Sequence, residues 1–335
     1  MATTYGILGG GSWATALAKI LTDNNHTINW WIRDEKNIAT FRKRKHNPHY
    51  VSSIMFDTAL IHFNDNVQQV IEQSSIILIA VPSAYVVQCL EQLPNNCFEN
   101  KKIISAIKGI IPPLNCLLNT YLENKFGIIQ SQYGIVAGPC HAEEVAAEKL
   151  SYLTFASSSI DDATDYSKHF ATAYIKTIVT TDVTGVQYAA VLKNIYAVGA
   201  GIAHGLDYGD NFMSVFIANA ANEMATFLRT ITGTNSEYTR ANYAASVYLG
   251  DLLVTCYSLH SRNRRFGNYL GKGYTVQAAQ LEMNMVAEGY NASSGIYTIN
   301  QTIKATMPIA SNIYQILWQQ KDAFDAFAEI ENELV

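Results

Sequence analysis

Tyr5–Leu21 reads YGILGGGSWATALAKIL, and this stretch decides the fold. Its first four residues form a short apolar run typical of a buried strand, and three glycines follow at once. The remainder is rich in alanine and leucine, which favour a helix. A strand, a glycine turn and a helix in this order are the context that a dinucleotide-binding loop requires. We therefore expect a nucleotide-binding domain at the start of the chain.

Single positions of this stretch fit such a loop. Gly9 allows a tight turn, Gly11 lets the backbone approach a pyrophosphate, and Ala14 takes the third glycine position, where a small residue keeps helix and strand in contact. The helix N-terminus offers N–H groups and a positive dipole end to phosphates. Ser12 and Trp13 are expected to line the pyrophosphate and nicotinamide half of a cofactor.

Composition narrows the class of protein. The chain has 335 residues, 49% of them hydrophobic and 15% charged, with a formal net charge of −5. This length predicts two domains, and the negative charge argues against a nucleic-acid binder, which usually shows a basic face. The basic run Arg42–Lys45 is most simply a solvated helix face. Its alternative role is to attract an anionic cofactor.

Five scattered cysteines include no C-x-x-C pair, which argues for a reducing compartment and against a zinc site or a disulfide framework. We expect no metal. The N-terminus has no charged region ahead of the first strand, and no uncharged apolar run approaches the roughly 18–20 residues that span a bilayer. A soluble, cytoplasmic protein without membrane insertion is the expectation.

The first half of the chain alternates between strand and helix patterns. Strands are expected over 28–32, 76–81, 102–106, 134–137, 152–156 and 175–179. This alternation predicts an α/β fold, a Rossmann-type doubly wound sheet covered on both faces. Past residue 184 only helical patterns remain, over 185–203, 211–230, 238–257, 275–288 and 309–318. We therefore predict a nucleotide-binding domain over 1–184 and an all-helical substrate domain over 185–335.

Further segments carry chemistry and follow the glycine loop in a fixed order. They are Val81–Ser83, Ala106–Gly109 (AIKG), Gly138–Ala146 (GPCHAEEVA), Leu192–Asn194 (LKN), Leu249–Leu252 (LGDL), Ser261–Gly267 (SRNRRFG) and Val286–Gly289 (VAEG). With them, nearly the whole chain resembles the NAD(P)-dependent glycerol-3-phosphate dehydrogenases of the bacterial biosynthetic type. The SRNRRFG run, ten residues after GDL, is the most specific single motif.

The resemblance implies that Lys193 is the general acid and base. Hydride transfer to a ketone builds negative charge on the carbonyl oxygen, which a positioned cation or acid should meet. Asp251 lies among apolar residues, where pairing with Lys193 would satisfy both groups. From the residues alone, Lys193 could also be a lysine extending from an apolar helix, and Asp251 a helix N-cap.

Arg262 is the candidate for the substrate phosphate, because a guanidinium grips phosphate in bidentate fashion. The arginine cluster could also be a solvated helix start. By resemblance, the substrate site consists of Lys108, Gly138, Cys140, Lys193, Asp251, Ser261, Arg262 and Asn263. Cys140 stands where the family usually has serine, and a thiol donates hydrogen bonds only weakly.

On the cofactor side, Arg33 ends the second expected strand, where arginine suits a 2′-phosphate. NADP(H) is therefore somewhat favoured, while the neighbouring Asp34 keeps NAD(H) possible. By resemblance, the cofactor site consists of Gly9, Gly11, Ser12, Trp13, Arg33, Tyr50, Lys108, Ala142, Arg262, Val286 and Glu288.

The implied reaction is the reduction of dihydroxyacetone phosphate to sn-glycerol 3-phosphate, which supplies glycerophospholipids, by a homodimer. Two alternatives stay open. One is a related dehydrogenase acting on another hydroxyacid or hydroxyacyl substrate. The other is a non-catalytic NADP-binding sensor, suggested by departures from the family at Asn219 and at Ala244–Leu249. The intact Lys193 and Asp251 oppose the sensor reading.

Overall fold

The computed structural model describes residues 3–233, 242–283 and 287–335. The chain forms two compact units: unit 1 spans Met1–Ile107 and Leu118–Val183, and unit 2 spans Lys108–Leu117 and Thr184–Val335. The structure thus differs from the expected boundary by grouping 108–117 with the helical part. In this segment Ile110 packs so closely on the helix α13 (Glu288–Ile303) that a Cβ on Gly295 would lie 2.6 Å from its side chain.

Unit 1 is built on one eight-stranded sheet with the order β3-β2-β1-β4-β5-β6-β7-β8. Neighbouring strands pair in parallel, except that β6 and β7 are antiparallel. The strands are β1 (Tyr5–Leu8), β2 (Ile28–Trp31), β3 (Ile61–Asn64), β4 (Ile76–Ile79), β5 (Lys102–Ser105), β6 (Tyr133–Ala137), β7 (Ser151–Ser157) and β8 (Ile175–Thr180). The expected α/β fold with a doubly wound sheet is confirmed.

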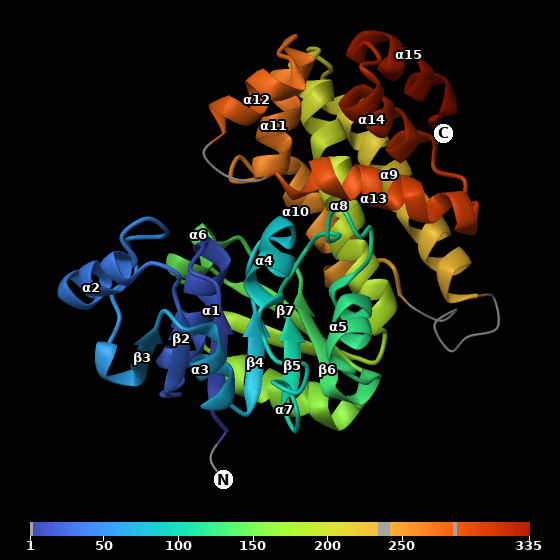
Figure 1. Cartoon of the computed structure of the whole chain (residues 1–335). Coiled ribbons are helices and arrows are strands. Elements are labelled where there is room, and N and C mark those ends of the chain that lie inside the picture. The colour runs from blue at the N-terminus through green and yellow to red at the C-terminus, as the bar shows by residue number, and fades with distance from the viewer. Residues whose placement is uncertain (1–2, 234–241, 284–286) are drawn as a thin grey trace. The chain divides into compact units, whose positions relative to one another are not determined.

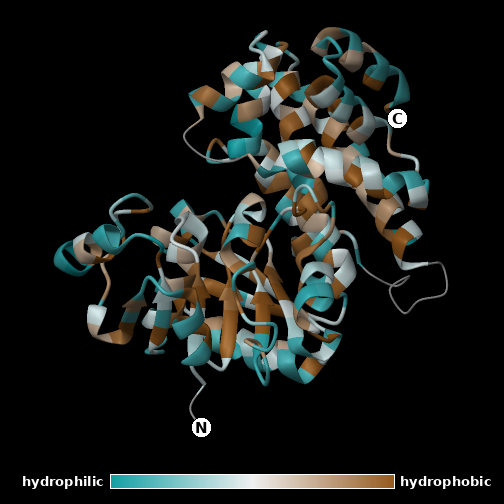
Figure 2. Cartoon of the chain, in the orientation of Figure 1, coloured by the Kyte–Doolittle hydropathy of each residue, from teal (hydrophilic) through white to brown (hydrophobic). Residues whose placement is uncertain are grey.

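Burial explains which strands the sequence reveals. All four residues of β1 and of β4 are buried, as in a strand covered on both faces. β3 was not among the expected strands, because it lies at the edge of the sheet and buries only Ile61 and Phe63. Figure 2 shows the central strands in hydrophobic colours and the helix α2 (Glu35–Arg44) mostly in hydrophilic ones.

Seven helices of unit 1 accompany these strands (Figure 1). They are α1 (Ser12–Asp23), α2 (Glu35–Arg44), α3 (Val67–Glu72), α4 (Val86–Leu90), α5 (Leu118–Phe126), α6 (Ala142–Ala146) and α7 (Ile160–Phe170). α1 contacts α6 and α7, whereas α3 packs on β1 and β2. This arrangement places the N-terminus of α1 directly after the end of β1, which is the geometry that the opening stretch predicts.

The described part of unit 2 is helical. Its helices are α8 (Val183–Gly205), α9 (Asp210–Thr232), α10 (Asp251–Tyr257), α11 (Arg262–Gly271), α12 (Val276–Glu282), α13 (Glu288–Ile303), α14 (Pro308–Gln319) and α15 (Ala323–Glu333). A π-helical turn, Ser246–Gly250, leads into α10. None of the described helices has the length and apolar character needed to span a membrane.

Two expected helices were wrong in their extent. The helix expected over 238–257 begins only with the π turn, because Asn242 Oδ1 accepts a hydrogen bond from the N–H of Ala244 (3.1 Å) and holds a local turn instead. The helix expected over 275–288 ends at Glu282, where Met283 turns to extended backbone. Residues 234–241 and 284–286 of these expectations lie outside the described residues.

Helices α8 and α11 cross at glycines that both contribute. A Cβ on Gly201 of α8 would lie 2.0 Å from the carbonyl oxygen of Arg264, and one on Gly267 of α11 would lie 2.0 Å from that of Val198. Real Cβ atoms cannot approach so closely, so the backbones touch only because these side chains are absent. The crossing sets the separation between the residues that the two helices present.

Candidate active site

The glycine loop of unit 1 has the conformation that its sequence predicts. Gly9 has φ +127°, and a Cβ there would lie 2.7 Å from the carbonyl oxygen of Ala80, so only glycine fits. Gly11 is the N-cap of α1, and no side chain caps this helix end. A Cβ on Gly11 would meet no atom within 4 Å, which leaves the backbone open to a ligand.

These features fit a nucleotide cofactor. Within the described part of the chain, the N–H groups of Gly10 and Gly11 donate no hydrogen bond. Unpaired N–H groups at a helix N-terminus are the donors that a pyrophosphate takes. The glycine loop therefore offers open space at Gly11 and the N–H donors that a dinucleotide would require.

Other expected cofactor residues surround this loop in unit 1. Ser12 is buried and Trp13 half-buried in the first turn of α1, and Ala14 is fully buried at the third glycine position. Arg33 lies exposed two residues beyond β2, and the neighbouring Asp34 accepts a hydrogen bond from Lys36 N (2.9 Å) as the N-cap of α2.

The segment that follows β6 holds three further expected residues. Gly138 has φ +132°, and a Cβ there would lie 2.5 Å from the carbonyl oxygen of Tyr152. The thiol of the buried Cys140 donates to the carbonyl of Gly138 (3.0 Å), and Ala142 begins α6. The turn after β6 therefore depends on glycine at position 138 and is stabilised by the hydrogen bond from the Cys140 thiol.

The centre of unit 2 is a buried ion pair. Lys193 Nζ on α8 lies 2.5 Å from Asp251 Oδ1 on α10, and the two side chains are 5% and 2% exposed. Asp251 is the first residue of α10, which follows the π turn directly, and Gly250 rather than Asp251 occupies the N-cap. Its carboxylate thus pairs with lysine, as the resemblance implies. Within the described residues, Asp251 Oδ2 has no hydrogen-bond partner.

Asn194, the neighbour of Lys193 on α8 and not among the expected site residues, connects α8 to two other segments of unit 2. Its Nδ2 donates to the carbonyl of Lys108 (2.7 Å), and its Oδ1 accepts from Asn263 Nδ2 (2.8 Å). Asn263 Oδ1 in turn accepts from the N–H of Gly289 on α13 (2.9 Å). A buried asparagine next to a buried lysine was the available signal, but its partners are distant in sequence.

This chain of hydrogen bonds brings several expected residues together in unit 2. Lys108, Lys193 and Asn263 are joined through Asn194, and Arg262 begins α11 one residue before Asn263. Ser261 is the N-cap of α11 and accepts from Arg264 N (3.3 Å). Glu288 begins α13, whereas Val286 lies outside the described residues.

The cysteine near the ion pair is held neutral. Burial raises the pKa of the Cys256 thiol to about 12, and the nearby charges of Lys193 and Arg264 oppose this rise only in part. A thiol that stays protonated is a poor nucleophile. Cys256 is therefore not a candidate nucleophile beside Lys193.

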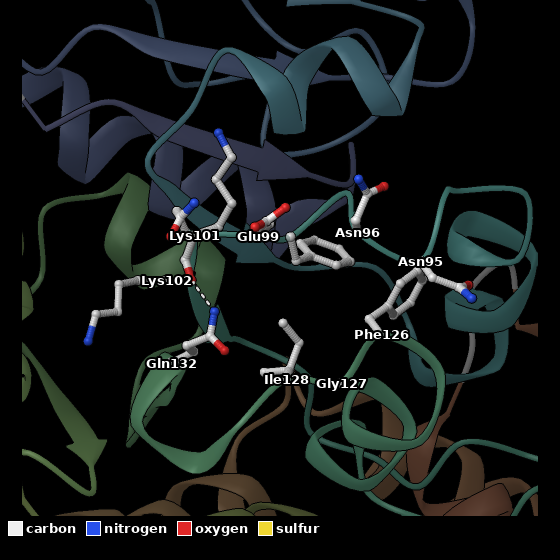
Figure 3. A pocket seen from close by; sticks show the side chains of 11 residues that line it. Asn95, Asn96, Glu99, Lys101, Lys102, Phe126, Gly127, Ile128 and Gln132 are labelled. Carbon is white, nitrogen blue, oxygen red and sulfur yellow. Dashed lines mark hydrogen bonds between the residues drawn. The ribbon is translucent and has the colours of Figure 1, made fainter.

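A cavity of about 690 Å³ lies elsewhere in unit 1, beside the first residues of β5 and β6, and Phe98, Phe126 and Ile128 line it (Figure 3). The two lysines at its edge are engaged: Lys101 donates to the carbonyl of Ser74 (2.7 Å), and Lys102 pairs with Asp162 (2.7 Å). Ligands of doubly wound sheets bind at the carboxyl ends of the strands. We therefore do not assign this cavity to the cofactor or the substrate.

Sequence comparisons place the chain among known proteins. Residues 4–163 match the family model of the NAD-dependent glycerol-3-phosphate dehydrogenase N-terminus, and residues 182–328 match that of the C-terminus. A glycerol-3-phosphate dehydrogenase (NAD(P)+) from Streptococcus pneumoniae is 34% identical over 330 residues, 98% of this chain and 96% of the relative. One from Streptococcus sanguinis is 33% identical over 97% of this chain and 94% of its own length.

Solved structures show the same similarity. The crystal structure of glycerol-3-phosphate dehydrogenase from Coxiella burnetii matches with a TM-score of 0.87 at 25% identity, and the match covers 98% of each chain. Both family models and relatives above 30% identity thus extend over nearly all of the sequence. The chain belongs to the family of NAD(P)-dependent glycerol-3-phosphate dehydrogenases.

Proposed function

We propose that this protein reduces dihydroxyacetone phosphate to sn-glycerol 3-phosphate with NAD(P)H, and that Lys193 gives the proton to the carbonyl oxygen. The observation that carries the proposal is the buried pair of Lys193 and Asp251 at 2.5 Å. Burying a lysine is costly unless a partner stabilises it. In an enzyme of this family, an ammonium group held in place by a buried carboxylate is suited to meet the charge that develops on the carbonyl oxygen.

The nicotinamide cofactor, when bound, supplies the hydride. As the substrate carbonyl is reduced, negative charge grows on its oxygen, and the Lys193 ammonium stabilises this charge and then donates a proton. In the reverse direction the neutral amine accepts that proton from the alcohol. Asp251 holds the ammonium in place through its Oδ1.

The phosphate end of the substrate is assigned to the start of α11. Arg262 offers a bidentate guanidinium, and Ser261 and Asn263 flank it. The link from Asn263 through Asn194 to the helix of Lys193 supports this assignment, because it fixes α11 against α8. Lys108 is tied to the same link through its carbonyl and is assigned to substrate and cofactor.

The residues of unit 1 are assigned to the cofactor and to a substrate loop. Gly138, Cys140 and Ala142 would form that loop, and the bond from the Cys140 thiol to Gly138 supports a role in its shape. Gly9, Gly11, Ser12, Trp13 and Tyr50 would hold the cofactor, together with Glu288 and Val286 of unit 2. Residues 1–184 would thus carry most of the cofactor contacts and residues 185–335 most of the substrate contacts, with the loop at Gly138 and the residues Val286 and Glu288 as exceptions.

We favour NADP(H) over NAD(H). Arg33 is exposed just past β2, where a 2′-phosphate would be read. The Asp34 carboxylate, which could have bound the ribose hydroxyls of NAD(H), is engaged as the N-cap of α2. A homodimer in the cytoplasm that supplies glycerophospholipid synthesis is the setting that the family relationship favours.

Initial rates of NADPH and NADH oxidation with saturating dihydroxyacetone phosphate test the reaction. We expect turnover with both cofactors and a higher kcat/KM with NADPH. Folded protein that binds nucleotide but turns over with neither cofactor would contradict the proposal.

The phosphate assignment is tested with Arg262→Ala. Losing a charge-assisted bidentate contact should lower kcat/KM for dihydroxyacetone phosphate by about 100-fold. The matched control is dihydroxyacetone, which lacks the phosphate and should lose little. Equal losses with the two substrates would rule out a phosphate contact.

A further inference from the structure

The three carbonyl groups of the glycine loop are each bound by a buried side chain of unit 1. Trp30 Nε1 on β2 donates to the carbonyl of Gly9 (2.7 Å), and Asn47 Nδ2 donates to that of Gly10 (3.0 Å). The hydroxyl of Thr15 on α1 donates to the carbonyl of Gly11 (2.9 Å). No carbonyl of the three glycines is left to turn toward an anion.

This arrangement determines where the loop N–H groups point. In a trans peptide, the C=O of one residue and the N–H of the next point in opposite directions. Binding the Gly9 and Gly10 carbonyls from the protein side therefore directs the N–H groups of Gly10 and Gly11 away from it. Those are the two N–H groups that donate no hydrogen bond within the described residues.

Asn47 controls more of this loop than the other two donors. It is 3% exposed, and its Nδ2 also donates to Thr15 Oγ1 (2.8 Å), the hydroxyl that binds the Gly11 carbonyl. Its Oδ1 accepts from the N–H groups of His49 (3.0 Å) and Tyr50 (3.2 Å). One side chain thus orients two glycine carbonyls and the backbone at Tyr50.

We propose that Asn47 is a positioning residue for the cofactor pyrophosphate: it holds the glycine loop with its N–H groups toward the phosphates without touching the cofactor. The inference rests on the proposed cofactor site. Its effect passes through Gly10 directly and through Thr15 to Gly11. Removing it would free the Gly10 carbonyl to rotate toward the anion, which it would repel, and would take away the group that orients the Thr15 hydroxyl on the Gly11 carbonyl.

Asn29 provides a matched control within unit 1. It is 4% exposed, and its Nδ2 donates to a carbonyl, that of Gln73 (3.0 Å), and to a hydroxyl, Ser74 Oγ (3.0 Å). Asn29 and Asn47 thus share burial and bonding, but Asn29 contacts no residue of the glycine loop by hydrogen bond. Leucine has nearly the same shape as asparagine and removes the donors without adding charge.

The experiment compares Asn47→Leu with Asn29→Leu in the full-length protein. For each variant, the dissociation constant (Kd) of NADPH is measured by fluorescence titration without substrate. The kcat at saturating NADPH and the Tm are measured separately. We expect Asn47→Leu to raise the NADPH Kd about tenfold, which corresponds to the loss of one good hydrogen bond. Its kcat should stay within twofold of the parent's. Asn29→Leu should lower Tm by a similar amount and leave Kd within twofold of the parent.

An unchanged Kd in Asn47→Leu, or an equal rise in Asn29→Leu, would overturn the proposal. If Asn47→Leu does not fold, Thr15→Val tests the same relay: it removes the hydroxyl that links Asn47 to the Gly11 carbonyl, leaves that carbonyl only the N–H of residue 15 (3.0 Å), and should raise Kd severalfold. If both fold, the double variant should bind about as weakly as Asn47→Leu, because the two side chains act in series. Binding without turnover in the parent protein would refute the proposed reaction but leave this comparison of Kd values intact.

Discussion

Gly11 in the glycine loop of unit 1 and Gly201 at the crossing of α8 and α11 in unit 2 both matter because they lack a side chain, but one leaves space for a ligand and the other for a neighbouring helix. A Cβ on Gly11 would meet no protein atom within 4 Å, whereas one on Gly201 would lie 2.0 Å from the carbonyl oxygen of Arg264. The first glycine leaves space for a ligand. The second lets the backbones of α8 and α11 touch, and the protein itself fills the space beside it.

The two regions therefore act by different chemical means. The glycine loop offers main-chain N–H groups, whose direction depends on what binds the carbonyls behind them. The helices of unit 2 offer side chains, Lys193 and Arg262, whose separation depends on how closely the helices pack. Adding a methyl group to a glycine should weaken ligand binding in the loop but lower stability at the helix crossing. Removing a functional side chain of unit 2 should instead lower the catalytic rate.

The largest effect is expected from Lys193→Met, which removes the proton donor and keeps the volume. General acid catalysis contributes typically 10²–10⁴-fold, so kcat should fall by about 10³-fold while the NADPH Kd stays within twofold. Single-turnover rates and fluorescence titration measure the two quantities. A loss of less than tenfold would show that another group donates the proton.

Lys19→Met is the matched control for this prediction. Lys19 is also a buried lysine, but it lies in unit 1 and pairs with two more exposed carboxylates, Asp23 (2.6 Å) and Glu148 (3.0 Å). Both variants should lose stability, since each leaves a carboxylate without its cation. Only the variant at Lys193 should lose three orders of magnitude in kcat, which separates the loss of the proton donor from the loss of a buried, paired lysine.

At the helix crossing, Gly201→Ala should destabilise the protein by about 3 kcal/mol, because α8 and α11 must separate to admit the methyl group. Urea unfolding measures this change. Gly209→Ser is the control: its Cβ would enter open space at the N-cap of α9, so we expect no loss of stability. Equal stability of the two variants would mean that the crossing does not depend on glycine.

The stability of unit 2 should depend on pH through a buried carboxyl group, Glu223. Glu223 on α9 accepts hydrogen bonds from Tyr196 on α8 (3.1 Å) and from the N–H groups of Ile309 (2.8 Å) and Ala310 (2.9 Å) at the start of α14. Burial nevertheless raises the pKa of Glu223 to about 7 from 4.5, as these bonds offset only part of the desolvation.

The folded protein therefore keeps a proton on Glu223 between pH 4.5 and 7 that the unfolded chain releases. Stability should fall as pH rises through this window, by up to about 3 kcal/mol, and level off above it. Urea unfolding of the parent and of Glu223→Gln at pH 5 and pH 8 measures this. If Glu223 is responsible, the variant loses that part of the pH dependence; identical slopes would assign it to other groups.

The comparison also explains what the sequence could reveal. The glycine loop was predictable because its strand, turn and helix are contiguous, and the fold class followed from buried strands with continuous apolar runs. Lys193 and Asp251 were predicted as a pair from a family resemblance and from an aspartate among apolar residues. Their 2.5 Å contact joins residues 58 positions apart, which no local pattern encodes.

Long-range contacts account for what the sequence analysis missed. Asn47 and Asn194 each form hydrogen bonds to residues far along the chain, so their roles appear only when those partners are placed. The glycines of α8 and α11 read as weak helix formers until the crossing shows why they are needed. The helix expected over 238–257 was wrong because a local turn at Asn242 competes with helical hydrogen bonds.

The smallest effect, and the sharpest test of the comparison, is expected from Gly11→Ala. The same change that unfolds the crossing at Gly201 adds a methyl group here to open space, so unfolding should change by less than about 1 kcal/mol, the cost of alanine at an N-cap. The methyl group would instead meet the cofactor pyrophosphate, and the NADPH Kd should rise about tenfold. Fluorescence titration and urea unfolding give the NADPH Kd and the free energy of unfolding for each of the two alanine variants. If Gly11→Ala unfolds the protein, or if Gly201→Ala weakens NADPH binding without loss of stability, the assignment of one glycine to a ligand and the other to packing is wrong.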